Sequence, residues 1–248
     1  RHMDLVDRRR FEIGQYWIKL TKASSSKNWL PDVSGRRPVM DTFGHAVKVL
    51  DKIRFDNPTG KLADDATMAA AVANFEKGKY GAADILFTDV RENFPKSDHL
   101  FEAYLLGLKS KLAMYEGPDY SGVVLDEAEG LVRTMMRPMF RREVKGHEEY
   151  LSNALKDIRL KKANREYSMA KFYDNRKEYG AARLYYNRVR QEYPDTNLAL
   201  ESENRLAAIA SYPDAPEENL EFIAKWFPED EGRAKPLLAR KTVDTKVR

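Results

Sequence analysis

The side chains that most often carry catalysis or bind metals are few in this chain and lie far apart. The chain has no cysteine, which excludes disulfides, thiol catalysis and thiolate metal ligands. Its histidines are His2, His45, His99 and His147, and none has a second histidine at the spacing of a helical metal site. The sequence therefore predicts no metal site and no cofactor.

The motifs of phosphate-binding and nucleophilic enzymes are also missing. The pair Gly78-Lys79 lacks the upstream glycine and the following Ser or Thr of a phosphate-binding loop, and Gly-x-Ser-x-Gly does not occur. An enzyme would need a convergent pocket of His, Asp or Glu side chains, which the sequence does not suggest. We therefore expect a protein that is not an enzyme.

Positive charge is concentrated at the C-terminus. Six of the 43 basic and one of the 39 acidic groups lie in residues 233–248, so the rest of the chain, with 37 against 38, is close to neutral. We expect residues 233–248 to form a disordered basic tail. The alternative is a tail that binds nucleic acid or anionic lipid. Nucleic-acid binding would have an affinity that falls steeply with salt, and the near-neutral body favours no nucleic-acid partner.

The N-terminus carries little information. The chain begins Arg1-His2-Met3, which we interpret as a cloning remnant over residues 1–3. A signal peptide or a lipid-bearing cysteine that once preceded it would leave no trace. No apolar run approaches the roughly 20 residues that a membrane-spanning helix needs.

An internal repeat defines the elements that would position a binding surface. A 16-residue pattern occurs twice, 99 residues apart, over residues 80–95 and 179–194, and a looser copy over 43–58 lies 37 residues before the first. In each copy the apolar residues recur at steps of three and four and a proline follows, which indicates a helix that the proline ends. Self-similarity at such periods is typical of stacked helical hairpins.

Each copy is preceded by a second helical stretch, and no region alternates as a strand would, so the sequence predicts hairpins and no sheet. The predicted fold is all-α, a right-handed α-α superhelix of about five hairpins. The first helix is expected over Phe11–Leu20, with the apolar residues Ile13, Tyr16, Trp17 and Leu20. The repeat domain is expected over 4–232, with hairpins at about 4–58 (with an insertion at 21–40), 61–95, 98–138, 147–194 and 197–228.

Small and bulky residues of the repeat are predicted to pack the hairpins together. A small side chain lets a neighbouring helix approach, and a bulky one a turn later fills the adjoining space. In the first hairpin Gly14 is the candidate for the small position, because the regular spacing falls on Ser34 in the insertion. The predicted packing residues are Ala71, Ala83, Phe87, Val90, Pro95, Ala170, Ala182, Tyr186, Val189, Tyr193 and Pro194.

This spacing resembles the tetratricopeptide repeat, in which small and large residues occupy the same places. A narrower resemblance rests on residues 155–196. That stretch is similar to the BamD (YfiO/ComL) family of outer-membrane assembly lipoproteins, through the segments Ala170–Tyr173, Tyr179–Ala182 and Tyr193–Thr196. The similarity extends over roughly residues 4–228.

The resemblance implies a non-catalytic scaffold, lipid-anchored on the periplasmic face of the outer membrane. It implies that the protein works with a BamA-like insertase and other assembly-complex subunits to fold outer-membrane β-barrel proteins. The C-terminal repeats would hold the insertase, and the N-terminal repeats would bind unfolded substrate segments. The alternative is a periplasmic tetratricopeptide adaptor in envelope division or peptidoglycan coordination, which would share the fold without the insertase contact.

The binding surface is predicted in the groove that a curved array of hairpins forms. Apolar pockets take anchor side chains, and flanking basic groups bind carboxylates. The resemblance implies substrates that end in an aromatic residue and a carboxylate. The predicted protein-binding residues are Tyr173, Arg176, Arg183, Tyr185 and Arg188 in the fourth repeat. The alternative is that these tyrosines pack in the fold and these arginines are solvated.

Overall fold

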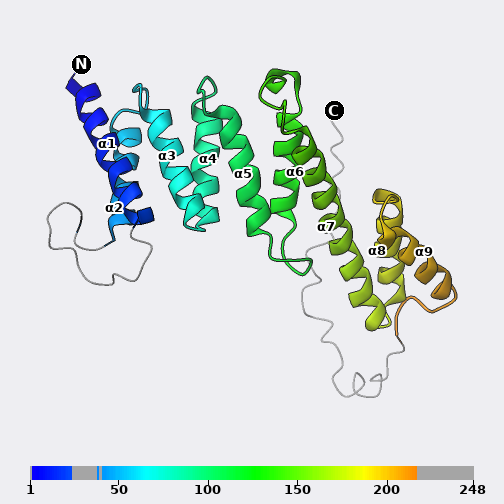
Figure 1. Cartoon of the computed structure of the whole chain (residues 1–248). Helices are drawn as coiled ribbons and strands as arrows, with labels where there is room; N and C mark the ends of the chain where they lie inside the picture. The colour runs from blue at the N-terminus through cyan, green and yellow to red at the C-terminus, as the bar shows by residue number, and fades with distance from the viewer. Residues whose placement is uncertain (1, 24–37, 39–40, 217–248) are drawn as a thin grey trace, which may run out of the picture.

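The computed structural model describes residues 2–23, 38 and 41–216, and within them the chain forms helices and no strand (Figure 1). The α-helices are α1 (His2–Ala23), α2 (Thr42–Asp56), α3 (Ala63–Glu76), α4 (Tyr80–Asn93), α5 (Leu100–Met114), α6 (Val123–Met135), α7 (Glu148–Asn175), α8 (Tyr179–Glu192) and α9 (Asn197–Ala208). A short 3₁₀ helix, Pro138–Phe140, lies between α6 and α7. The predicted all-α fold is confirmed.

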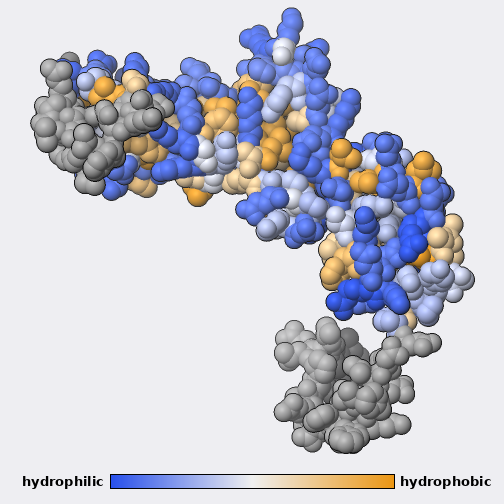
Figure 2. Space-filling view, turned by 60° about the horizontal axis from the view of Figure 1, so that its bottom comes forward, coloured by the Kyte–Doolittle hydropathy of each residue, from blue (hydrophilic) through white to orange (hydrophobic). Residues whose placement is uncertain are grey.

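The helices form a row of antiparallel hairpins in which each helix packs against its neighbours in the sequence. The pairs are α1 with α2, α3 with α4, α5 with α6 and α7 with α8, and α9 packs on α8. Figure 2 shows the elongated, bent row from another side, with hydrophobic residues visible between hydrophilic ones. The second helix expected in the last hairpin, most of the 21–40 insertion and the 233–248 tail lie outside the described residues.

The first helix differs from the prediction in its length and in the face that it buries. Helix α1 begins at His2 rather than at Phe11, and Ile13 and Tyr16 are exposed by 43% and 47%. Phe11 and Ile18 pack against the core instead, because residues seven apart return to the same side of a helix. Ile13 and Tyr16, two of the apolar residues of the predicted helix, therefore do not lie on its packed side.

Gly14 lies on the same side of α1 and permits close contact with α2. It is buried, and a Cβ atom built there would lie 2.9 Å from the side chain of Leu50. Because this distance is shorter than van der Waals contact, a larger residue would displace Leu50 or separate the two helices. This agrees with the assignment of Gly14 to the small position of the first hairpin.

The buried side chains form three clusters along the row. The first extends from α1 to α5, the second joins α5, α6 and α7, and the third joins α7, α8 and α9. Helix α7, which is 28 residues long, belongs to two of them. Leu151 and Ile158 in its first half pack with α5 and α6, and Ala170 in its second half packs with α8 and α9.

Most of the residues predicted to pack the repeats are inaccessible to solvent. Pro95 and Pro194 are exposed and stand two residues beyond the ends of α4 and α8, and Tyr193 is partly buried. The buried members are Ala71, Ala83, Phe87, Val90, Ala170, Ala182, Tyr186 and Val189.

The turns inside the second and fourth hairpins share a backbone conformation but not a residue type. Gly78, between α3 and α4, has φ 72°, and Lys177, at the matching place between α7 and α8, has φ 61°. Both values lie in the left-handed region, where glycine is at ease and a side chain is strained. The fourth hairpin therefore keeps the turn geometry at some cost in stability.

Candidate functional site

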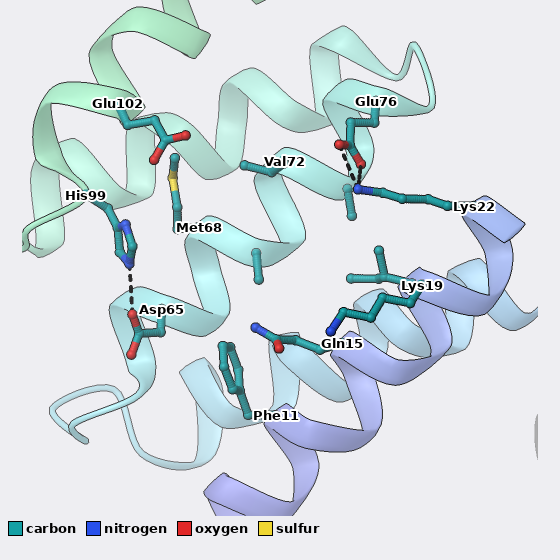
Figure 3. Close-up of a pocket in the computed structure, with 13 residues that line it drawn as sticks. Phe11, Gln15, Lys19, Lys22, Asp65, Met68, Val72, Glu76, His99 and Glu102 are labelled. Atoms are coloured by element: carbon teal, nitrogen blue, oxygen red, sulfur yellow. Dashed lines mark hydrogen bonds and ion pairs between the residues drawn. The ribbon is translucent and has the colours of Figure 1, made fainter.

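A groove of about 480 Å³ lies between the first helices of the first three hairpins, α1, α3 and α5 (Figure 3). Its apolar part is formed by Phe11 and Ile18 of α1 and by Met68 and Val72 of α3. Ala69 and Ala73 of α3 also line it. Since alanine side chains are short, they leave room beside the larger residues that an incoming apolar side chain can occupy.

Charged and polar groups line the ends of this groove. At one end, Nζ of Lys22 lies 2.5 Å from Oε2 of Glu76, and at the other, Nε2 of His99 lies 2.8 Å from Oδ1 of Asp65. Figure 3 shows both contacts as dashed lines. Each pair joins a nitrogen-bearing side chain to a carboxylate, so both ends of the groove are polar.

Lys19 and Glu102 line the same groove and form no ion pair with another described residue. Figure 3 shows the side chains of Lys19 and Gln15 extending from α1 toward α3. An ammonium group beside an apolar surface can bind a carboxylate whose neighbouring side chain is apolar. The Gln15 amide offers both a donor and an acceptor to a peptide backbone. The groove is therefore suited to the C-terminal end of a peptide.

The structure brings three of the five residues predicted to bind protein into one cluster on the fourth hairpin. The rings of Tyr173 and Tyr185 are stacked, with centroids 5.4 Å apart and planes 10° apart. The guanidinium carbon of Arg188 lies 5.3 Å from the centroid of the Tyr185 ring. Nη1 of Arg188 also donates to Oε2 of Glu166 at 2.9 Å, and this hydrogen bond raises the pKa of Arg188.

Arg176 lies outside this stack, at the turn between α7 and α8. Its Nε donates to Oε1 of Glu178 at 2.7 Å, and its guanidinium carbon lies 5.4 Å from the centroid of the Phe172 ring. The Arg176 side chain is 61% exposed, so solvent reaches the ion pair. It keeps a guanidinium face at the surface, close to an aromatic ring.

Arg183 contacts the segment that follows α9. Its Nη1 donates to the carbonyl oxygens of Ile209 at 2.8 Å and Tyr212 at 3.1 Å, and its Nη2 pairs with the carboxylate of Asp214. The end of a helix leaves carbonyl oxygens without intrahelical partners, and a guanidinium can satisfy them. Arg183 therefore has a structural role in holding this segment against α8.

A second hollow, between α7 and α9, has its main charges paired inside the chain. Asp174 accepts from Nε and Nη2 of Arg205 at 2.6 and 2.7 Å, and this pairing lowers the pKa of Asp174. The hydroxyl of Tyr167 donates to Oε2 of Glu201 at 2.8 Å. Burial and this hydrogen bond raise the pKa of Tyr167 to about 12. The network holds α9 against α7.

Gln15 and Lys19 of the groove were not among the residues predicted from the sequence. A signal for them exists, because Gln15 lies between Phe11 and Ile18, which face the core, and Lys19 directly follows Ile18. Polar residues four apart beside such a pair border the buried side of a helix.

Two further observations concern the described residues. They contain no group of three or more His, Cys, Asp or Glu side chains that could hold a metal ion. None of their helices combines the length and the apolar character that crossing a membrane requires.

These features define the class of the protein as a helical-hairpin repeat protein of tetratricopeptide type. The family model named YfiO, outer membrane lipoprotein, matches residues 39–213, from α2 to beyond α9. The chain therefore belongs to the YfiO family of outer membrane lipoproteins. This confirms the family resemblance inferred from the sequence. No curated protein matches the chain.

Proposed function

We propose that the protein is a non-catalytic scaffold of the machinery that assembles β-barrel proteins in the outer membrane. It binds a BamA-like insertase and unfolded outer-membrane protein segments at the periplasmic face of the membrane, where a lipid anchor holds it. Membership of a family of outer membrane lipoproteins supports this location. The observation that carries the substrate-binding role is the groove with an apolar floor and an ammonium group available at Lys19.

The groove supplies both groups that a C-terminal aromatic residue with its carboxylate would need. Phe11 and Val72 offer an apolar surface for the ring, and Lys19 offers a cation for the carboxylate. Gln15 can hydrogen-bond the backbone of the preceding residue. This arrangement selects a chain end over an internal segment, because only a chain end places a carboxylate beside its last side chain.

The insertase contact is assigned to the cluster on the fourth hairpin. Tyr173, Tyr185 and Arg188 combine stacked aromatic rings with a guanidinium group, and aromatic and arginine side chains dominate the energetics of protein interfaces. Arg176 adds an exposed guanidinium nearby. Arg183 contributes by holding the segment after α9 in place.

The substrate-binding role is tested with a labelled peptide of alternating apolar residues that ends in phenylalanine. Fluorescence anisotropy should show that the free acid binds about tenfold more tightly than the C-terminal amide, because a hydrogen-bonded charge is lost. Lys19→Gln should remove this difference. Lys48→Gln, at an exposed lysine of α2, is the matched control and should leave it unchanged. Equal binding of acid and amide by the wild type would refute this role.

The insertase contact is tested by affinity capture from detergent-solubilised membranes. The wild-type chain should retain a BamA-like protein, and the double variant Tyr185→Ala/Arg188→Ala should lose it. Leu184→Ala is the control, because Leu184 lies on the same helix and is 58% exposed. Failure of the wild type to retain such a protein would argue against the proposed function.

A further inference from the structure

The segment between α6 and α7, residues 136–147, is an ordered loop with a buried anchor. Phe140 is only 4% exposed, and its ring lies 5.7 Å from that of Phe101 and 5.3 Å from that of Tyr104. The backbone N–H of Val144 donates to the carbonyl of Phe140 at 2.9 Å. These contacts fix the loop on α5 and determine which side chains it presents to solvent.

The loop presents two methionines and an excess of positive charge. Met136 and Met139 are 51% and 64% exposed, although nothing in the packing requires apolar residues there. Glu143 is the only acidic residue of the loop. The four cations are all exposed and form no ion pair with another described residue: Arg137, Arg141, Arg142 and Lys145.

This pattern differs from that of several cations on the neighbouring helices, which form ion pairs. Arg133, in the last turn of α6, hydrogen-bonds Glu129, and Lys162 of α7 lies 2.6 Å from the same carboxylate. In the loop, by contrast, the cations stand beside exposed thioether side chains. Such a combination suits the surface of a phospholipid bilayer, where cations can contact the phosphate groups and apolar side chains can reach the hydrocarbon below them.

The position of the loop agrees with contact to such a surface. Figure 1 shows it at the same edge of the row as the N-terminal end of α1. That end carries exposed Leu5, with 61% of its surface accessible, and exposed Arg8. A flat surface laid along this edge would therefore meet apolar and basic side chains at both places.

We propose that the 136–147 loop binds the surface of an anionic phospholipid bilayer. Arg137, Arg141 and Arg142 contact lipid phosphates, and Met136 and Met139 enter the boundary between headgroups and acyl chains. The setting at the outer membrane rests on the proposed function, but the binding itself depends neither on the peptide groove nor on the insertase. The contact would fix the orientation of the hairpin row relative to the membrane.

The first experiment measures cosedimentation of the full chain with vesicles of phosphatidylglycerol and phosphatidylcholine. The variant Arg141→Gln/Arg142→Gln should bind about 30-fold more weakly than the wild type at low salt. Lys48→Gln/Lys52→Gln removes the same charge from exposed positions of α2 and should change binding less than about threefold. Equal losses in the two variants would show that net charge alone drives binding and would overturn the proposal.

The second experiment uses the absence of cysteine from the chain. A polarity-sensitive fluorophore on Met139→Cys should shift to shorter wavelength on anionic vesicles. The same label on Ile85→Cys should not shift, although Ile85 and Met139 are exposed by 65% and 64%. An unshifted label at position 139 would overturn the proposal.

The third experiment distinguishes a lipid surface from an acidic protein as the binding partner of the loop. Polyglutamate replaces the vesicles in the same series of variants. Binding of polyglutamate that depends on Arg141 and Arg142, without binding to vesicles, would overturn the lipid proposal in favour of an acidic protein partner. Loss of vesicle binding in these variants should leave the anisotropy of the groove peptide unchanged, so the two proposals fail separately.

Discussion

The ammonium group of Lys111 links the second and third hairpins, and removing its charge should weaken their contact. Its Nζ lies 2.8 Å from Oδ2 of Asp84 on α4 and 2.6 Å from Oε2 of Glu127 on α6. The side chains of Lys111 and Asp84 are only 8% and 14% exposed, whereas that of Glu127 is 51% exposed. Without the lysine, Glu127 would be hydrated, but Asp84 would remain a largely buried carboxylate without an ion-pair partner.

The proposed change is Lys111→Met, which keeps most of the aliphatic stem and removes the charge. Removing one member of a buried pair costs roughly 3–5 kcal/mol, and an exposed pair is worth about 0–1 kcal/mol. Since Asp84 keeps some contact with water, we expect the free energy of unfolding to fall by about 2–3 kcal/mol. In Lys111→Met/Asp84→Leu no buried carboxylate is left without a partner, because Glu127 is largely exposed, and stability should return to within about 1 kcal/mol of the wild type.

The assay is urea unfolding followed by circular dichroism, together with amide exchange of α4 and α5. Amide exchange is needed because hairpin arrays can open locally without global unfolding. Lys156→Met, at an exposed position of α7, should change stability by no more than about 0.5 kcal/mol. The reasoning is refuted if Lys111→Met is as stable as Lys156→Met. It is also refuted if Lys111→Met/Asp84→Leu is less stable than Lys111→Met.

Three further predictions concern the turns and the last hairpin. Lys177→Gly should stabilise the chain by about 0.5–1 kcal/mol in urea unfolding, because position 177 needs a left-handed backbone. Gly78→Ala should destabilise it by a similar amount for the same reason. A loss of stability in Lys177→Gly would contradict this. Arg183→Met should speed amide exchange in α9 and lower the free energy of unfolding by about 1–2 kcal/mol, because carbonyl oxygens after that helix lose their donor. Unchanged amide exchange would show that the hydrogen bonds of Arg183 do not stabilise α9. The folded-state pKa of Asp174 is depressed by hydrogen bonds from Arg205, so its contribution to stability is present above the ordinary value of 3.8 and is lost as pH falls through the folded-state value. Thermal unfolding of Asp174→Asn below pH 4 should therefore be less sensitive to pH than that of the wild type, and parallel pH profiles would argue against this.

The stack of hairpins could be predicted because its signals are local and repeated. Ala83 and Phe87 lie one turn apart on one helix, and Ala182 and Tyr186 repeat the arrangement 99 residues later. All four are buried. Burial of one helix face leaves a periodic pattern in the sequence, which can be read without knowledge of the partner helix.

The beginning of α1 could not be predicted in this way, because its stabilising contact is polar and distant. Asp7 is 2% exposed, and its Oδ2 accepts a hydrogen bond from Nδ2 of Asn57 at 3.0 Å. Arg10 lies 3.6 Å from the other carboxylate oxygen. A charged residue in a polar stretch predicts exposure, and the partner that permits its burial lies 50 residues away.

The role of Arg183 was hidden for the same reason. An arginine on a helix near tyrosines is typical of a binding surface, and the sequence does not show that carbonyl oxygens of Ile209 and Tyr212 lie within reach. The groove also depends on tertiary structure, since α1, α3 and α5 line it together. Sequence periodicity could indicate which side of each helix is buried, but not that a groove remains between the three helices.

The most direct test of the account is photo-cross-linking from the groove. Benzoylphenylalanine in place of Gln15 should capture a peptide that ends in phenylalanine with a free carboxylate, through the last residues of the peptide. Capture should fall in the Lys19→Gln background, and the same photoreactive residue at Asn175, in the hollow between α7 and α9, should capture little. Capture that is stronger from position 175, or that ignores both Lys19 and the free carboxylate, would contradict the assignment of this groove to substrate chain ends.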